Sequence, residues 1–565
     1  MRRLSRAIHR ALERSPGAVD PAIALGLGVA CTALLLATAH TLGYARDEGF
    51  YFHAAESYAR WFEQLAREPA VALERRSIDA AFAVNREHPV LMKSLFALSW
   101  LAQKKWHLFA EEGTSFRFPA MLTAGMTTGL CYLWGTAVRG RAAGLVAAAL
   151  FALVPTTFYH AHLACFDVPI AGLWLLVAWC YHRSLVTRSV GWALATAVSF
   201  GLALDTKHNS WFLPIAFVAH LLVRRGPGLV RDLRAGRLAV PLAWPLMAVI
   251  GPVVLVTLWP FIWYDTAERL AWYVRFHTRH DYYNIEFLGE TYWQPPFPRS
   301  YAWLTTAATV PVVALVLFVI GLAVAARERL PAYLARWRGH AHDQASEASD
   351  PGGARLLWLL GVAVNYGPWL SRGTPIFGGT KHWLAAYPFV ALFGGLGFAW
   401  AAAKLVDAAP TPAWRRAAPW LLGASVVVAP AVETLRAHPW GLSAYTPLVG
   451  GASGAASLGF NRGFWGYTTG SLVDELNARV PPGGSVYIHD TAWDAWRMLQ
   501  RDGRLRADLR VAASPAGADA AIYHHEQHMS GVEQQIWIAL GTTTPAAVRG
   551  LDGVPIVWLY LRRGL

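Results

Sequence analysis

The sequence predicts an all-α membrane protein: a polytopic bundle of about 11 transmembrane helices, with further helices in the membrane interface and a small C-terminal α/β domain. Three observations predict this class. Of the 565 residues 55% are hydrophobic and only 15% are charged, against about 25% charged in soluble proteins. Several apolar segments approach the roughly 20 residues that cross a bilayer. The arginines behind the net charge of +14 cluster between these segments, which is the positive-inside pattern and not that of a nucleic-acid-binding protein.

The basic clusters give each crossing its direction. Met1–Arg14 is basic and no cleavage site follows it, so we expect a retained first span with the N-terminus in the cytoplasm. The alternation then holds throughout if 89–103, which is short and contains Lys93, lies in the interface instead of crossing. The predicted spans are 21–44, 118–138, 142–159, 169–182, 190–204, 211–223, 241–263, 302–326, 355–370, 383–404 and 418–432.

Composition divides the chain near residue 433. Residues 1–433 form the predicted transmembrane domain, with 47–105 as its first periplasmic loop and an amphipathic helix starting near Asp47. Its inside loop 340–353 is polar and expected to be flexible. Residues 434–565 have a soluble composition and form the predicted periplasmic α/β domain. We expect strands at 485–490 and 518–524, helices at 493–501 and 531–540, and a hairpin within 548–563 around Asp552-Gly553.

The threading brings most of the unusual polar residues to one side of the membrane. Asp47 and Glu48 follow the first span, and the others are His88, His160, His162, Asp167, Lys207, His208, Lys381 and His382. Each has a plain alternative: Asp167 can cap a helix, the lysines can snorkel, and the histidines can lie unliganded in the interface. Carboxylates beside cations at the membrane edge suit chemistry on a lipid-linked phosphate, because a carboxylate accepts a proton while cations stabilise a phosphate leaving group.

Several short motifs occur in a recognisable order. They are Asp47-Glu48 after the first span, Glu87-His88-Pro89-Val90-Leu91, Arg117-Phe118-Pro119, Asp167 at the start of a span, and Gly201-Leu202-Ala203-Leu204-Asp205-Thr206-Lys207. Their order and spacing resemble the integral-membrane GT-C glycosyltransferases, in particular the protein O-mannosyltransferases and the lipid A aminoarabinose transferases. The likeness covers about residues 20–210. The chain departs from both branches in having Val90 after the Pro, and it has His208-Asn209 where a Gly is common.

The resemblance implies an enzyme that transfers a sugar, with inversion, from a polyprenyl-phosphate donor to a hydroxyl of a lipid, glycan or protein. Asp47 would be the catalytic base, with Glu48 and Asp167 as the other acidic residues of the site. The residues expected to bind the donor phosphate are His88, Lys93, Lys207, His208, Lys381 and His382. We expect no metal to be required, with a divalent cation held by His160, His162 and Asp167 as the alternative.

The expected location is a bacterial inner membrane, with the active site facing the periplasm. The expected partners are the lipid-linked donor, its acceptor and membrane lipids, and no nucleic acid. Two other functions stay open. A transporter or flippase needs ionisable groups near the bilayer midplane, whereas here they gather at one edge. An O-antigen ligase or polymerase would carry its key Arg and His residues in a large late outer loop, and the Arg and His residues of loop 264–300 leave this function open.

Overall fold

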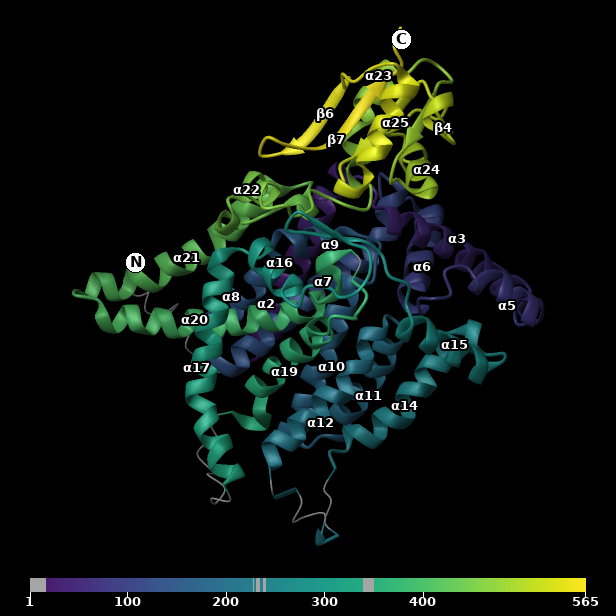
Figure 1. The fold of residues 1–565 in the computed structure, drawn as a ribbon. Helices are drawn as coiled ribbons and strands as arrows, with labels where there is room; N and C mark the ends of the chain where they lie inside the picture. The colour runs from purple at the N-terminus through teal and green to yellow at the C-terminus, as the bar shows by residue number, and fades with distance from the viewer. Residues whose placement is uncertain are drawn as a thin grey trace.

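A computed structural model describes residues 17–226, 228–229, 234–236, 240–338, 350–376 and 378–564, and it is mostly helical (Figure 1). The predicted basic N-terminus (Met1–Arg14) and residues 340–349 of the predicted flexible loop lie outside these ranges. The longer helices before the C-terminal part are α2 (Asp20–Thr38), α3 (Arg46–Arg67), α5 (Arg75–Phe82), α6 (Leu91–Trp106), α7 (Glu112–Arg139), α8 (Arg141–Ala152), α9 (Pro155–His162), α10 (Asp167–Thr187), α11 (Val190–Leu204), α12 (Phe212–Arg225), α14 (Ala243–Leu258), α15 (Thr266–Thr278), α16 (Tyr301–Thr309), α17 (Val312–Trp337), α19 (Ala354–Tyr366), α20 (Tyr387–Ala408) and α21 (Pro412–Ala437).

Two predicted spans are wrong as single helices. The predicted span 142–159 is two helices, α8 and α9, bent by 67° at the residues before Pro155. The predicted span 302–326 is likewise divided between α16 and α17, with Pro311 in the break. Proline has no amide hydrogen and disfavours a helical conformation in the residue before it, so a helix tends to end there.

The number of crossings stays a prediction. Within the described ranges, three helical segments are long and apolar enough to cross a membrane, and the bent pair of α8 and α9 would be a fourth. These three are Asp20–Thr41, Leu384–Ala408 and Pro412–Ala437. The remaining predicted spans correspond to helices that are shorter, broken or more polar.

The helices of the bundle approach closely where glycines face each other. A Cβ added at Gly28 of α2 would lie 2.8 Å from the carbonyl oxygen of Gly125 in α7. A Cβ at Gly321 of α17 would likewise collide with the carbonyl of Phe393 in α20. Small residues allow such backbone contact, which is how helices in a membrane gain van der Waals attraction without a hydrophobic driving force.

The segment after the first predicted span contains the predicted amphipathic helix. α3 buries Phe52, Ala55 and Tyr58 and exposes His53 and Arg60. It packs on α6, the helix of the predicted interfacial segment 89–103, and on α24 (Trp493–Arg501) of the C-terminal part. α3 therefore lies between the helical bundle and the C-terminal strands (Figure 1).

The C-terminal part is a mixed five-stranded sheet with helices, and its predicted elements are observed. The strand order is β4-β3-β5-β7-β6, with β3 parallel to β4 and β5, and with β7 antiparallel to β5 and β6. The hairpin turns at Asp552-Gly553, as predicted. The elements are α22 (Gly451–Ser457), α23 (Val473–Arg479), β3 (Ser485–Ile488), α24, β4 (Arg510–Ala512), β5 (Ala520–His524), α25 (Ser530–Leu540), β6 (Ala547–Leu551) and β7 (Val554–Leu561).

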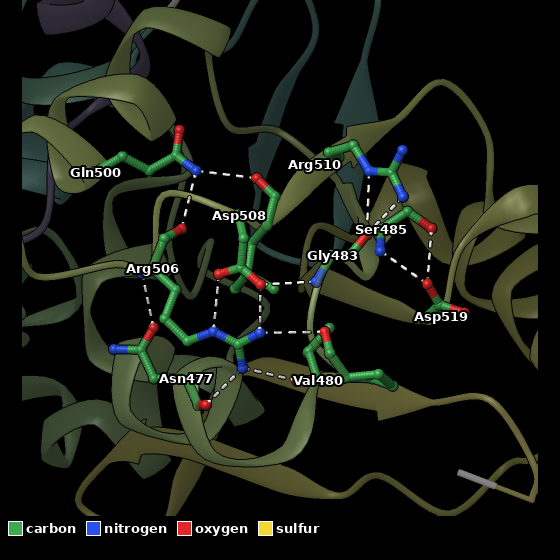
Figure 2. Close-up of polar contacts among 11 residues, drawn as sticks. Asn477, Val480, Gly483, Ser485, Gln500, Arg506, Asp508, Arg510 and Asp519 are labelled. Carbon is green, nitrogen blue, oxygen red and sulfur yellow. Dashed lines mark hydrogen bonds and ion pairs between the residues drawn. The ribbon is translucent and has the colours of Figure 1, made fainter.

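Polar contacts hold the loops at one edge of this sheet (Figure 2). The Arg506 guanidinium donates to both carboxylate oxygens of Asp508, at 2.7 and 3.0 Å, and to the carbonyl oxygen of Asn477. Asp508 also accepts from the backbone amide of Gly483 at 2.6 Å. The loops before β3 and β4 are thereby tied together, although β4 was not expected from the sequence.

Candidate active site

Asp47 and Lys381 form an ion pair between two distant parts of the chain. Asp47 lies in the first turn of α3, and Lys381 lies in a 3₁₀ turn, Gly379–His382. Lys381 Nζ is 3.2 Å from Asp47 Oδ2, and the Asp47 side chain is 19% exposed. The loop folds tightly over this lysine, because a Cβ at Gly378 (φ +74°) would lie 2.4 Å from Lys381 Cε. The partly exposed carboxylate of Asp47 is therefore held beside the ammonium group of Lys381, whose position the loop fixes.

Asp167 and Lys207 form a second pair next to the first. Lys207 Nζ donates to Asp167 Oδ1 at 2.7 Å, and the two side chains are only 8% and 6% exposed. Asp167 opens α10 and Lys207 follows α11, so a single helical hairpin supplies both. His160 Nδ1 lies 3.8 Å from Asp167 Oδ2. Asp47, Asp167, Lys207 and Lys381 all lie close enough to His160 to act on its charge, so the two pairs face one site.

Trp465, which was not predicted as a site residue, lies over this site. Its indole ring lies 4.3 Å from Lys381 Nζ and 5.8 Å from the His160 ring. Its backbone is in the left-handed region (φ +72°), and its carbonyl accepts from the amide of Arg46 at 2.8 Å. A bulky residue in that conformation is strained and persists only where its surroundings impose it. Trp465 is thus locked over the lysine paired with Asp47.

His88 and His208 lie in a histidine cluster together with His277, which was not selected as a site residue. The rings of His208 and His277 stack at 4.2 Å, and the rings of His88 and His277 are 6.2 Å apart. Burial, followed by the charge of neighbouring basic groups, lowers the pKa of His88 and of His208 well below its ordinary value. Burial also lowers the pKa of His277 to about 4. These rings are neutral near pH 7, so they offer hydrogen bonds and no positive charge.

Two of the predicted site residues are engaged elsewhere. Glu48 is fully buried and pairs with Arg117 through Nε and Nη2, both at 2.8 Å, while accepting from the amides of Ala45 and Ala164. Lys93 is fully buried too, and it donates to the backbone carbonyls of Asn85 (2.6 Å) and His88 (2.8 Å). Glu48 therefore anchors the start of α3, and Lys93 shapes the loop that contains His88.

His382 is buried beside Lys381. Its ring lies 4.7 Å from that of Trp369, and its carbonyl accepts from the Asn209 side chain at 3.4 Å. This contact links the Lys381 turn to the segment that follows Lys207.

The alternative cation site at His160, His162 and Asp167 is wrong in one ligand. His162 uses both ring nitrogens, Nδ1 toward the carbonyl of Phe158 and Nε2 toward Thr38 Oγ1, each at 2.8 Å. It lies on the last turn of α9 and faces α2, because two residues further along a helix turn the side chain far from that of His160. His160 and Asp167 alone remain at the site.

Residues 88–261 match the family model described as dolichyl-phosphate-mannose-protein mannosyltransferase. No curated protein matches the chain. Among solved structures, the chain is similar to ArnT from Cupriavidus metallidurans bound to undecaprenyl phosphate, with 15% identity, a TM-score of 0.43, and coverage of 96% of this chain and 98% of that one.

A second solved structure is similar over most of its length. It is the archaeal oligosaccharyltransferase AglB from Archaeoglobus fulgidus in complex with an inhibitory peptide and a dolichol-phosphate, with 12% identity, a TM-score of 0.44, and coverage of 91% of this chain and 71% of that one. The matched family model includes the segment with His88, Asp167 and Lys207 and begins after Asp47. It confirms the resemblance found in the sequence motifs, and the chain is a glycosyltransferase.

Proposed function

We propose that this glycosyltransferase transfers a sugar from a polyprenyl-phosphate-linked donor to a hydroxyl acceptor, with inversion at the anomeric carbon. One observation carries the proposal: two carboxylate–lysine pairs, Asp47–Lys381 and Asp167–Lys207, meet around His160. A single displacement needs a base for the attacking hydroxyl and cations for the departing phosphate, and these pairs contain both.

Asp47 is the proposed base. The acceptor oxygen bonds to the anomeric carbon while the bond from that carbon to the phosphate oxygen breaks, and the hydroxyl proton passes to the Asp47 carboxylate. The lipid phosphate leaves with the electron pair of the broken bond. Its charge is stabilised by Lys381 and Lys207, at a site from which most water is excluded, so each charge acts strongly.

The exposure of the two acids supports this division of roles. Asp47 is 19% exposed and lies 3.2 Å from its lysine, whereas Asp167 is 6% exposed and lies 2.7 Å from its own. An acceptor can approach Asp47, and a donor phosphate can draw Lys381 away from it. Asp167 is the better anchor, because it holds Lys207 and lies 3.8 Å from His160.

The proposed roles of the remaining residues follow from their partners. Glu48 and Lys93 act as structural residues, since their polar atoms are bound within the protein. His88, His208 and His382 lie near the two lysines and are proposed as hydrogen-bonding groups around the donor. Within the described residues the site holds two lysines and a neutral histidine cluster, and the proposed reaction routes no step through a metal.

The proposed location is a bacterial inner membrane, with this site on the periplasmic side. It rests on the basic clusters, which alternate with the apolar segments as the positive-inside pattern requires. The donor sugar and the acceptor are to be identified by mass analysis of glycolipids and envelope glycans in a deletion strain, complemented with the wild-type protein.

Asp47→Asn tests the proposal in that complemented strain and with purified protein. We expect transfer to fall by about 100-fold or more, because general-base catalysis contributes roughly 10²–10⁴-fold. Binding of undecaprenyl phosphate, measured by native mass spectrometry, should persist. Asp79→Asn is the matched control: like Asp47→Asn it removes a carboxylate that is paired with a cation, here Arg269, but outside the site. Near-normal transfer by Asp47→Asn would disprove the base assignment.

A further inference from the structure

A second cluster of ionisable side chains lies where the outer loop meets the C-terminal sheet. Glu286 comes from β1 (Ile285–Phe287), which pairs with β2 (Glu290–Tyr292) in a short hairpin. Glu526 and His528 follow β5 of the C-terminal sheet. One donor atom from each of the three lies within 4.8 Å of the other two. The reaction proposed above uses none of them.

The cluster is buried and its geometry is specific. The side chains of Glu286 and His528 are 4% and 6% exposed, and that of Glu526 is 12% exposed. His528 Nδ1 lies 2.8 Å from Glu286 Oε1, which also accepts from the His528 amide at 3.0 Å. His528 Nε2 lies 3.7 Å from Glu526 Oε2. Each imidazole nitrogen therefore has a carboxylate oxygen near it, and Nδ1 also lies 3.1 Å from the side-chain nitrogen of Asn284.

A third carboxylate, from Asp490, adds an independent observation. Its side chain is 5% exposed and lies beside Glu526. Asp490 Oδ1 is 2.5 Å from the Arg46 guanidinium, while Oδ2 is buried without a hydrogen-bond partner. Two carboxylates thus lie near His528 and a third lies beside Glu526, with one arginine at the edge. Buried carboxylates are costly unless a cation compensates them.

We propose that Glu286, Glu526 and His528 bind a divalent transition-metal ion, with Asp490 as a further oxygen donor at the edge of the site. Carboxylate oxygens together with an imidazole nitrogen suit Zn²⁺ or Mn²⁺, whereas Ca²⁺ and Mg²⁺ take oxygen ligands. The ion would tie the β1–β2 hairpin to the C-terminal sheet. It would also balance the charge on Asp490, whose other oxygen holds Arg46 next to Asp47.

The plain alternative is a salt link without metal, in which a protonated His528 is held between Glu286 and Glu526. The metal content of the full-length protein distinguishes the metal site from this salt link. It is measured by inductively coupled plasma mass spectrometry on protein purified in detergent. We expect about one zinc or manganese per chain. After treatment with a chelator, added Zn²⁺ or Mn²⁺ alone should bind in calorimetry and raise the unfolding temperature, with Ca²⁺ and Mg²⁺ much weaker.

Variants locate the site. Glu286→Gln and His528→Gln should each weaken metal binding by about tenfold or more, because each removes a ligand or its orienting partner. Glu290→Gln is the matched control, since it changes an exposed glutamate of the same hairpin. The proposal is overturned if the wild-type protein contains no metal and neither ion binds after chelation. It is also overturned if Ca²⁺ binds best, or if both ligand variants bind as the wild type does. The wild-type measurements decide the question even where a variant fails to fold.

Discussion

The variant Arg117→Met tests whether Glu48, which follows Asp47 at the start of α3, has a structural or a catalytic role. Arg117 is 1% exposed, and it donates to Glu48 twice and to the carbonyls of Gly43 (2.6 Å) and Ala39 (3.3 Å). Methionine fills a similar volume but donates nothing. It would leave the Glu48 carboxylate buried with only two backbone amides as donors.

The expected cost follows from this geometry. Breaking a buried ion pair by removing one partner costs about 3–5 kcal/mol, because the remaining charge stays uncompensated. For a protein of this size we expect the unfolding midpoint in detergent to fall by about 5 °C or more. In the double variant Glu48→Gln/Arg117→Met neither charge remains, so its destabilisation should be smaller than the sum of the two single effects by about 1–3 kcal/mol.

The assay combines differential scanning fluorimetry of the purified variants with sugar transfer in a complemented deletion strain. If Glu48 is structural, the double variant should transfer sugar in proportion to its folded amount, in contrast to Asp47→Asn. An inactive but well-folded double variant would make Glu48 catalytic and refute this reasoning. An Arg117→Met protein as stable as the wild type would refute the energetic estimate.

Three further predictions concern the site and its surroundings. Trp465→Ala should slow transfer by up to about 30-fold, with Trp465→Phe in between, because a cation–π contact contributes about 0.5–2 kcal/mol; equal rates would exclude a positioning role. Between about pH 6.5 and pH 4, His277 is neutral in the folded protein but protonated in the unfolded chain. The free energy of unfolding therefore falls as pH falls through this window. His277→Gln should reduce that acid loss by up to about 3 kcal/mol in thermal unfolding at pH 4.5 and 7; an unchanged pH dependence would contradict it. With the four native cysteines replaced, Ser371→Cys should react with an impermeant reagent from the periplasm and Arg188→Cys only from the cytoplasm; the reverse result would invert the topology.

Local signals predicted local structure well. The helices at 190–204 and 493–501 have the predicted bounds: the first is a nearly continuous apolar run, and the second has apolar residues at helical spacing. The hairpin turn at Asp552-Gly553 has positive φ at both residues, +49° and +79°, as a type I′ turn requires. Breaks within helices were harder to predict from the sequence, since Pro155 is the single residue in its apolar run that signals the break.

The sequence was enough to predict that the candidate site residues lie on the same side of the membrane. It was not enough to predict which of their side chains contact each other. Alternation of the spans brings Asp47, Asp167, Lys207 and Lys381 to one side, which needs only the order of apolar and basic segments. This order cannot show which of Asp47 and Glu48 faces the site, because adjacent helical residues point in different directions. The partner that holds Glu48 away from the site, Arg117, lies 69 residues away in the chain. Trp465 is one of 27 tryptophans, so its type alone carries no signal. Its position over Lys381 depends on a tertiary contact with Arg46.

The two carboxylate–lysine pairs contain the same residue types, yet loss of the carboxylate should affect stability and lipid binding differently in each. Asp167→Asn leaves Lys207 almost fully buried without its 2.7 Å partner, so we expect a stability loss of about 3–5 kcal/mol together with weaker binding of undecaprenyl phosphate. Asp47→Asn leaves Lys381 beside a more exposed position that water can enter, and its cost in stability should stay near 1 kcal/mol. Thermal unfolding and native mass spectrometry of both variants measure this contrast. Equal losses of stability would contradict the contrast in burial. An Asp167→Asn protein that kept both stability and lipid binding while losing turnover would make Asp167 the base instead.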